Sequence, residues 1–122
     1  APLIHDFAVI SLSDLLTPME VIEKRVSAAA QADFVICIYN PSSKKRGDYL
    51  KKACEIVAKS RSEETVCGIV KSIGRQGEEM EILSLKELKD RQTDMFTTVF
   101  IGNSSTRKIG DYMVTPRGYH YG

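Results

Sequence analysis

The feature of this sequence that most constrains its fold is an unbroken apolar run at residues 34–39, FVICIY, followed by Asn40 and Pro41. A short run of aromatic and β-branched residues without polar alternation is typical of a strand covered on both faces. Proline cannot donate a hydrogen bond to a β-ladder, so Pro41 marks the end of the strand. We therefore expect an interior strand at residues 34–39.

Further apolar runs of strand length alternate with amphipathic segments along the chain. We expect strands at residues 7–12, 66–70, 80–83 and 97–101, with the third and fourth strands of the chain joined as a hairpin. Two helices are indicated by apolar residues that recur on one face, and a short third helix is expected at residues 86–91. The predicted helix faces consist of Met19, Ile22, Val26, Ala29 and Ala30, and of Leu50, Ala53, Cys54 and Val57. This order predicts an α/β domain with a mixed sheet of about five strands flanked by helices.

The clearest helix start in the chain is Thr17-Pro18-Met19-Glu20. Thr17 can cap the free backbone amides, and Glu20 can complete a capping box. Proline suits the first helical position because its missing N–H is not needed there. We therefore expect the first helix to begin at Pro18.

Composition favours a single soluble domain. The chain has 122 residues, 43% of them apolar, which is enough for one core and too few for two ordinary domains. The 17 basic and 16 acidic residues nearly cancel, so nucleic acid is not an expected partner. The apolar runs are far shorter than a membrane span, and no signal segment is visible, so we expect a cytoplasmic protein without a membrane partner.

Metal binding and disulfide formation are not indicated. The three cysteines, Cys37, Cys54 and Cys67, are an odd number at wide spacing, which fits neither a disulfide framework nor a thiolate zinc site. Each falls within an apolar strand-like run or on an apolar helix face, so reduced, packed thiols are expected. His5 and His120 are too isolated to suggest a metal centre.

Three loops directly follow apolar strands and could form a ligand site: residues 39–41, 72–75 and 103–106. Ligands of open α/β sheets bind beyond the carboxyl ends of strands, where such loops converge. The same residue types also build ordinary turns, and residue type alone favours that interpretation. The residues alone therefore indicate an α/β domain with a candidate crevice, but they do not indicate a reaction.

Residues 5–18, HDFAVISLSDLLTP, resemble a long signature of the precorrin-3B C(17)-methyltransferases, within the tetrapyrrole methylase family. The resemblance continues at residues 20–25 and covers nearly the whole chain. Further matching segments are residues 38–41, 43–46, 68–70, 74–75, 101–104 and 115–119. Departures from the usual family pattern are Ile4 in place of glycine, Met19 in place of tryptophan, and Ser72-Ile73 in place of Asn-Ala.

The resemblance implies a two-domain enzyme that holds S-adenosylmethionine in the cleft between its domains. Residues 1–122 resemble only the carboxy-terminal domain. The amino-terminal domain, with its glycine- and proline-rich loop, has no counterpart, so we expect this fragment alone to be inactive. The implied reaction is methyl transfer to carbon 17 of a precorrin-3-type tetrapyrrole, with ring contraction, in cobalamin (corrin) biosynthesis. The family also commonly forms homodimers, and a domain made to pack against a partner leaves an apolar surface bare, so we expect a homodimer.

Matching positions carry the implied site residues. The candidate cofactor-binding residues are Tyr39, Asn40, Ser72, Ile73, Gly74 and Asn103. The candidate substrate-facing residues are Ser11, Ser13, Asp14, Thr17 and Arg117. Two alternatives stay open: a sister tetrapyrrole methylase acting at another ring carbon, and a non-catalytic binding module that kept the fold.

Overall fold

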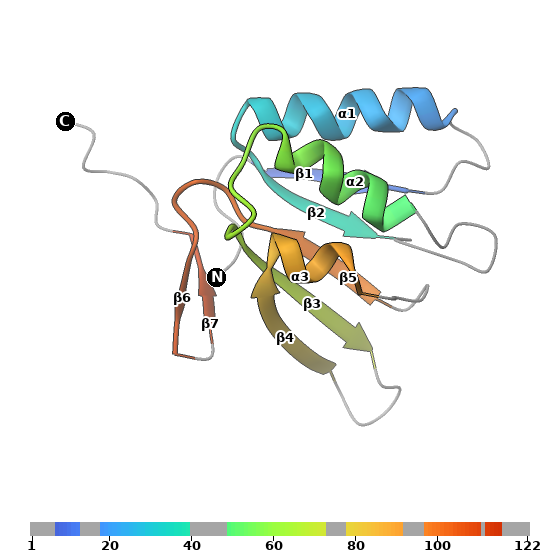
Figure 1. Ribbon diagram of the computed structural model, residues 1–122. Coiled ribbons are helices and arrows are strands. Elements are labelled where there is room, and N and C mark those ends of the chain that lie inside the picture. Colours follow the sequence, from blue (N-terminus) through green and yellow to red (C-terminus); the bar gives the residue numbers. More distant parts are fainter. Residues whose placement is uncertain are drawn as a thin grey trace.

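One five-stranded mixed sheet carries three helices on one of its faces (Figure 1). The structure is a computed structural model, and it describes residues 7–12, 18–39, 49–72, 78–91, 97–110 and 112–115. The strands of the sheet are, in spatial order, β1 (Phe7–Ser11), β2 (Val35–Tyr39), β5 (Thr97–Ile101), β3 (Val66–Ser72) and β4 (Glu78–Ser84). The helices are α1 (Met19–Gln31), α2 (Tyr49–Ala58) and α3 (Leu85–Lys89). The predicted α/β class and mixed five-stranded sheet are confirmed.

Strand direction decides which loops can meet. Strand β1 pairs parallel with β2, whereas β5 pairs antiparallel with both β2 and β3, and β4 pairs antiparallel with β3. Strands β1, β2 and β3 therefore run in one direction, and β4 and β5 run in the other. The helical connections from β1 to β2, from β2 to β3 and from β4 to β5 each join parallel strands, as strand–helix–strand units require.

Helix α1 buries the predicted face. Ile22, Val26, Ala29 and Ala30 are buried against the sheet, and Met19 packs partly buried beside them. The expected start of this helix was wrong by one residue. Pro18 has an extended ψ of 142° and precedes the helix as its cap, and its carbonyl accepts the backbone N–H groups of Val21 and Ile22. Thr17, the predicted capping residue, lies outside the described residues.

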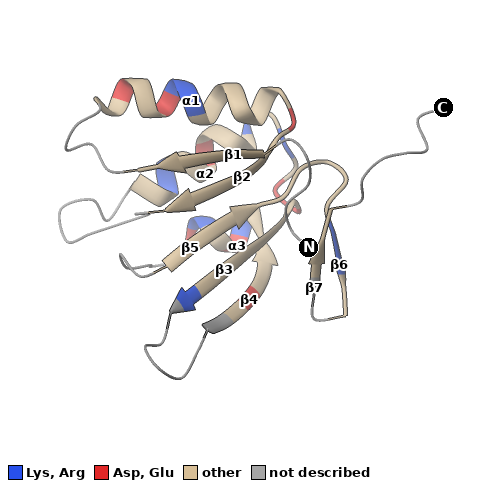
Figure 2. Ribbon diagram, turned by 180° about the vertical axis from the view of Figure 1, so that it is seen from behind, with Lys and Arg blue, Asp and Glu red and all other residues tan. Residues whose placement is uncertain are grey.

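The helices cover only one face of the sheet (Figures 1 and 2). In β2, Ile36 and Ile38 point to the helices and are fully buried. Of the alternate residues, Val35 is fully buried, Cys37 is half-buried and Tyr39 is 44% exposed. The expectation that both faces of this strand are covered is therefore only partly met. We call the surface away from the helices the open face.

A two-stranded hairpin, β6 (Arg107–Ile109) and β7 (Tyr112–Val114), follows β5 and was not predicted. Gly110, with φ +59°, occupies the turn, where glycine has no Cβ to clash. Met113 of β7 is buried and packs over Gly68 of β3, where a Cβ would lie only 3.3 Å from the Met113 sulfur. The absence of a side chain at Gly68 therefore lets the hairpin pack on the open face.

The three thiols are free, and Cys54 and Cys67 are buried, as expected for packed cysteines. None of the described helices is long and apolar enough to cross a membrane.

Candidate functional site

The ends of β1, β2 and β3 lie at one edge of the sheet, because these three strands run in the same direction. The last residue of β1, Ser11, pairs with the last residue of β2, Tyr39. Across the sheet, Tyr39 pairs with Thr98, which pairs with Val70, two residues before the end of β3 at Ser72. Three of the predicted site residues, Ser11, Tyr39 and Ser72, are therefore brought to one edge. We call this the tip edge.

Tyr39 is the exposed aromatic residue of the tip edge. Its side chain is 44% exposed and lies on the open face, in the cross-strand row Ser11, Tyr39, Thr98, Val70 and Met80. Its backbone carbonyl is not available to a ligand along the strand, because it accepts the Leu12 N–H at 3.2 Å. The ring and the loop that follows, rather than this carbonyl, are what Tyr39 can offer to a bound molecule.

Seven other predicted site residues lie outside the described residues: Asn40, Ile73, Gly74, Ser13, Asp14, Thr17 and Arg117. Asn40 directly follows Tyr39 in the sequence, and Ile73 and Gly74 directly follow Ser72. Their predicted roles stay predictions.

The expectation that the third loop joins the other two was wrong. Asn103 follows β5, which runs against β2 and β3, so it lies at the opposite end of the sheet from Tyr39 and Ser72. Ile101, at the end of β5, pairs with Ile36 near the start of β2. Asn103 therefore cannot share a single small-ligand site with the tip edge.

Asn103 holds its own turn together. Its side-chain oxygen accepts the Ser105 backbone N–H at 2.9 Å, and its backbone N–H donates to the Thr106 hydroxyl at 2.9 Å. Thr106 in turn hydrogen-bonds the hydroxyl of Thr115 at 2.7 Å in the interior. These contacts connect the turn to the segment after the hairpin, and they give Asn103 a structural role.

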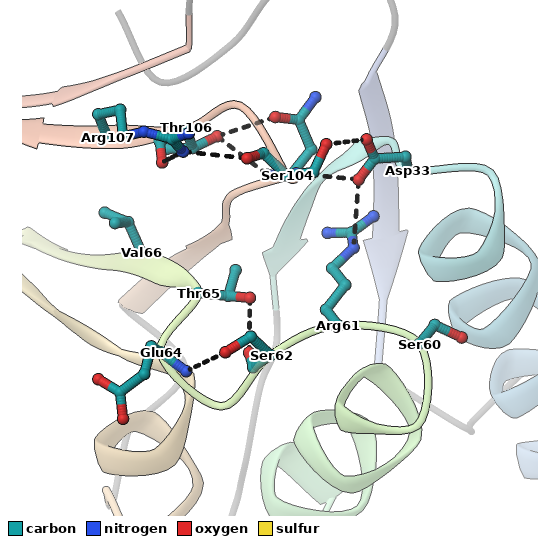
Figure 3. Close-up of a pocket in the computed structure, with 11 residues that line it drawn as sticks. Asp33, Ser60, Arg61, Ser62, Glu64, Thr65, Val66, Ser104, Thr106 and Arg107 are labelled. Atoms are coloured by element: carbon teal, nitrogen blue, oxygen red, sulfur yellow. Dashed lines mark hydrogen bonds and ion pairs between the residues drawn. The ribbon is translucent and has the colours of Figure 1, made fainter.

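A cavity of about 460 Å³ opens beside this turn (Figure 3). It is lined by Asp33, Ser60, Arg61, Ser62, Glu64, Thr65, Val66, Asn103, Ser104, Thr106 and Arg107. Its two acidic and two basic side chains balance in formal charge. Most of its polar groups are engaged in holding neighbouring segments, as the contacts of Arg61 and Asp33 show.

Arg61 is the centre of that arrangement. Its side chain is only 4% exposed, and its guanidinium donates to the carbonyls of Gly102 at 2.7 Å, Ala29 at 3.1 Å and Phe34. These carbonyls belong to the end of α1 and to the segments flanking β2 and β5. Burial lowers the pKa of Arg61, and the nearby Asp33 carboxylate, 3.9 Å from its Nε, opposes that shift. A buried cation at the carboxyl end of a helix also complements the helix dipole.

Asp33 is placed by the way α1 ends. Its φ of +61° is in the left-handed region, which Asp tolerates better than most residues other than Gly and Asn. The Asp33 N–H donates to the Ala30 carbonyl, and the Phe34 N–H donates to the Ala29 carbonyl, which is a Schellman ending with Asp in the usual glycine position. The Asp33 carboxylate then accepts hydrogen bonds from the backbone N–H and the hydroxyl of Ser104.

Sequence reasoning missed this cluster, which we call the Arg61 cluster: Arg61, Asp33 and Ser104. Two signals were present. Asp33 follows a helix pattern at the position where a left-handed residue is expected, and Arg61 stands just beyond the next helix. Neither signal tells which partner each residue finds, because the contacts join segments up to 71 residues apart.

No family model matches the chain. A Salmonella typhimurium protein named "Probable cobalt-factor III C(17)-methyltransferase" is 50% identical over 119 residues, which cover 98% of this chain and 49% of that protein. The precorrin-3B C(17)-methyltransferase of Sinorhizobium sp is 40% identical, again over 98% of this chain and 49% of that protein. Among solved structures, the methyltransferase CobJ superposes with a TM-score of 0.81 at 33% identity, over 92% of this chain and 47% of that one.

The chain thus spans about half the length of these relatives. The similar CobJ structure agrees with the mixed sheet and helices described above. Both the sequence signature and the fold point to the same group of proteins. The chain is homologous, over nearly all of its length, to about half of a cobalt-factor III or precorrin-3B C(17)-methyltransferase.

Proposed function

We propose that this chain, within a full-length protein, forms one wall of a cleft that binds S-adenosylmethionine for methyl transfer to a tetrapyrrole in cobalamin biosynthesis. The observation that carries the proposal is 50% identity over 98% of the chain to a protein named as a C(17)-methyltransferase. The other wall is proposed to come from the half of the full-length protein that this chain does not match. On its own, the chain is expected to be inactive.

The tip edge suits such a ligand. Tyr39 and Ser72 end strands that are separated by β5 alone, which puts the two strands roughly 10 Å apart. The row beside them, with Ser11 and Thr98, combines an exposed aromatic ring with small uncharged hydroxyl residues. Aromatic faces and neutral hydrogen-bonding groups are what a nucleoside requires of its binding wall. The loop residues Asn40, Ile73 and Gly74 complete the proposed cofactor wall.

Asn103 is not part of this proposed wall, since it lies at the far end of the sheet. The proposed substrate-facing residues are Ser11, Ser13, Asp14, Thr17 and Arg117. Of these, Ser11 belongs to the tip edge, in the same row as Tyr39.

Bound S-adenosylmethionine would supply a methyl group on a positively charged sulfur, which is reactive without a protein nucleophile. Tyr39, Asn40, Ser72, Ile73 and Gly74 would hold this group, which would donate its methyl to carbon 17 of the macrocycle, with the sulfur keeping the electron pair of the broken sulfur–carbon bond. The protein's part is to hold the ligands in line, and orientation of this kind removes roughly 7 to 11 kcal/mol from a barrier.

The proposed substrate is a precorrin-3-type macrocycle methylated at carbon 17. One relative is named for cobalt-factor III and another for precorrin-3B, so both substrates are to be offered to the full-length protein. Transfer to a ring carbon other than 17 would favour the alternative of a sister methylase. We also propose a cytoplasmic location and a homodimeric assembly.

Titration calorimetry with S-adenosylhomocysteine tests the proposal. Two proteins are compared: this chain alone, and the chain fused to the complementary half of the Salmonella relative. We expect binding only by the fusion, because each half supplies part of the cofactor site. Equal binding by the isolated chain would instead favour a self-sufficient binding module. Absence of binding by a folded fusion would overturn the cofactor role.

A further inference from the structure

One buried donor of the Arg61 cluster has no hydrogen-bond acceptor among the described residues. It is the Nε–H of Arg61, whose side chain is only 4% exposed. An oxygen of the Asp33 carboxylate lies 3.9 Å from this nitrogen, beyond the roughly 2.7 to 3.2 Å of an N–H···O hydrogen bond. The terminal nitrogens of the same guanidinium, in contrast, donate to backbone carbonyls. Buried polar groups are nearly always paired, so this unpaired donor requires an explanation.

The unpaired donor belongs to the wall of the 460 Å³ cavity, which both Arg61 and Asp33 line. Figure 3 shows the guanidinium pointing toward the Asp33 carboxylate, between the turn that carries Thr65 and the turn that carries Ser104. Five of the eleven described lining residues have a hydroxyl group. The volume lies in the range of roughly 300 to 1,000 Å³ that is usual for small-molecule sites, and one water occupies only about 30 Å³. The cavity can therefore hold a ligand of several polar groups.

One oxygen atom can pair with both Arg61 and Asp33. An oxygen that lies about 2.8 Å from each group, at a tetrahedral angle, spans about 4.6 Å. The present separation is 3.9 Å, so the carboxylate has to shift by only about 0.7 Å to admit it. Nε is closed off from solvent until this shift occurs. The Asp33 side chain is 47% exposed, so it can make such a movement at the surface.

The charges on the two sides of this point select a neutral group. An anion would be repelled by the Asp33 carboxylate, and a cation would be repelled by the Arg61 guanidinium. A hydroxyl group accepts from the Nε–H through a lone pair and donates its own hydrogen to the carboxylate. Nearby hydroxyls are suited to further ligand O–H groups. Thr65 donates to the Ser62 carbonyl at 2.6 Å and Ser104 donates to Asp33, so the lone pairs of both hydroxyl oxygens remain as acceptors.

We propose that this cavity binds a small neutral molecule with several hydroxyl groups, such as a sugar unit, through a hydroxyl that bridges Arg61 Nε and the Asp33 carboxylate. The bound molecule would contact the end of α1, the turn after α2 and the turn after β5. This site lies at the opposite end of the sheet from the tip edge. It is therefore a second site, separate from the proposed methyl transfer.

Titration of the ¹⁵N-labelled chain with D-ribose, followed by NMR, tests the proposal. The backbone amide of Ser104 and the Nε–H of Arg61 should shift and saturate, with a dissociation constant on the order of 1 to 10 mM for a ligand of about ten non-hydrogen atoms. The Nε proton should move downfield, because it gains an acceptor. The amide of Tyr39, at the tip edge, should not shift.

Arg61→Lys keeps the positive charge but lacks the Nε donor, so it should weaken ribose binding at least tenfold. Arg91→Lys is the matched control, because Arg91 pairs with Glu81 on the surface, and it should bind ribose as the wild type does. Sodium phosphate and glycine, offered to the wild type, probe the preference for a neutral ligand. Neither should give a saturable shift of the Arg61 Nε–H.

Absence of saturable shifts when ribose is added to the wild type overturns the proposal and leaves the cavity to water. This measurement does not depend on whether the Arg61→Lys variant folds. Tighter binding of phosphate or glycine than of ribose overturns the proposal as well, and so does equal ribose binding by the two lysine variants. No experiment of this set involves S-adenosylhomocysteine, so its failure is distinct from failure of the cofactor role.

Discussion

Asp33 and Ser104 are 71 residues apart in the sequence, and the Ser104 backbone N–H donates a 2.9 Å hydrogen bond to the Asp33 carboxylate. The Ser104 hydroxyl donates to the second oxygen of the same carboxylate, and Arg61 lies on its other side. The end of α1 and the turn after β5 are thereby joined at the end of the sheet away from Tyr39. The Arg61 cluster therefore stabilises the sheet whose strands end at the tip edge.

Replacing Arg61 by methionine should lower the free energy of unfolding by about 3 kcal/mol, because the backbone carbonyls of Gly102, Ala29, Ala30 and Phe34 lose a buried charged donor at once. Methionine keeps much of the side-chain volume, so the effect isolates the hydrogen bonds from packing. Urea unfolding at fixed protein concentration measures it. Arg91→Met is the control. Arg91 pairs with Glu81 on the surface, and its loss should leave the unfolding midpoint nearly unchanged. Equal effects of the two substitutions would contradict a central role for Arg61.

Asp33 should tolerate asparagine better than alanine. Asparagine also accepts the left-handed φ of +61°, and its side-chain oxygen can still accept the Ser104 N–H. Alanine loses both advantages, and we expect it to cost roughly 2 to 4 kcal/mol, against about 1 kcal/mol for asparagine. Thermal unfolding of the two variants compares them. An alanine variant as stable as the asparagine variant would show that the carboxylate contacts contribute nothing.

Gly102 and Gly110 should respond to alanine for different reasons. A Cβ at Gly102 would lie 2.5 Å from the Thr106 Cβ and 2.6 Å from the Val66 carbonyl oxygen, so the strand end and the turn must separate. We expect Gly102→Ala to cost about 3 kcal/mol or more. Gly110 has open space around it but a φ of +59°, so Gly110→Ala should cost only about 1 to 2 kcal/mol. Denaturant unfolding measures both losses of stability, and a larger loss for Gly110→Ala than for Gly102→Ala would contradict this explanation.

Stability should fall in alkaline solution because of the buried thiols. Burial raises the pKa of Cys54 from 9.0 to about 12, and it raises the pKa of Cys67 as well. Between pH 9 and 12 the unfolded chain has lost the Cys54 proton while the folded chain retains it, so the free energy of unfolding decreases as pH rises. The stabilisation is complete below pH 9 and disappears toward pH 12. Each thiol contributes a slope of up to about 1.4 kcal/mol per pH unit.

Cys54→Val tests the alkaline effect, because valine fills the site without a titratable group. The variant should lose stability less steeply than wild type between pH 9 and 11 in urea unfolding. Parallel curves for the two proteins would exclude the Cys54 thiol as a cause.

Tyr39→Ala should weaken binding of S-adenosylhomocysteine at least tenfold in the fusion protein described above, since the exposed ring belongs to the proposed cofactor wall. Phe7→Ala is the matched control. Phe7 is a comparably exposed aromatic residue on the same face, 42% against 44%, but it lies at the start of β1, away from the tip edge. Calorimetric titration of both variants should show a loss only for Tyr39→Ala.

Most elements of the fold could be predicted from local patterns. The helix face with Ile22 and Val26 is buried as its pattern requires, and the run at residues 34–39 forms an interior strand in which Ile36 and Ile38 are fully buried while Tyr39 is exposed. The hairpin β6–β7 could not be predicted in this way. Its strands have three residues each, and the residue that anchors it, Met113, depends on the space that Gly68 leaves on a distant strand.

The candidate site was only partly predictable, because the position of a loop depends on strand direction. Tyr39 and Ser72 end strands that run in the same direction, so they lie at one edge of the sheet, as expected. Asn103 does not, although a signal was available. A hairpin reverses the chain between β3 and β4, and the helix that follows returns it parallel to β4, so β5 must end at the opposite edge. The Arg61 cluster required the packed structure, since its three members come from separate segments.

The location of β5 also bears on how the chain folds. It is the middle strand of the sheet but the last of the five to be synthesised, so β1–β2 and β3–β4 remain two separate pairs until residue 101 has been made. Their union depends on contacts of long sequence separation, which form slowly. Until β5 has left the ribosome, a nascent chain would expose two unpaired strand edges. Chaperones can bind at these edges, and misassembly can begin there.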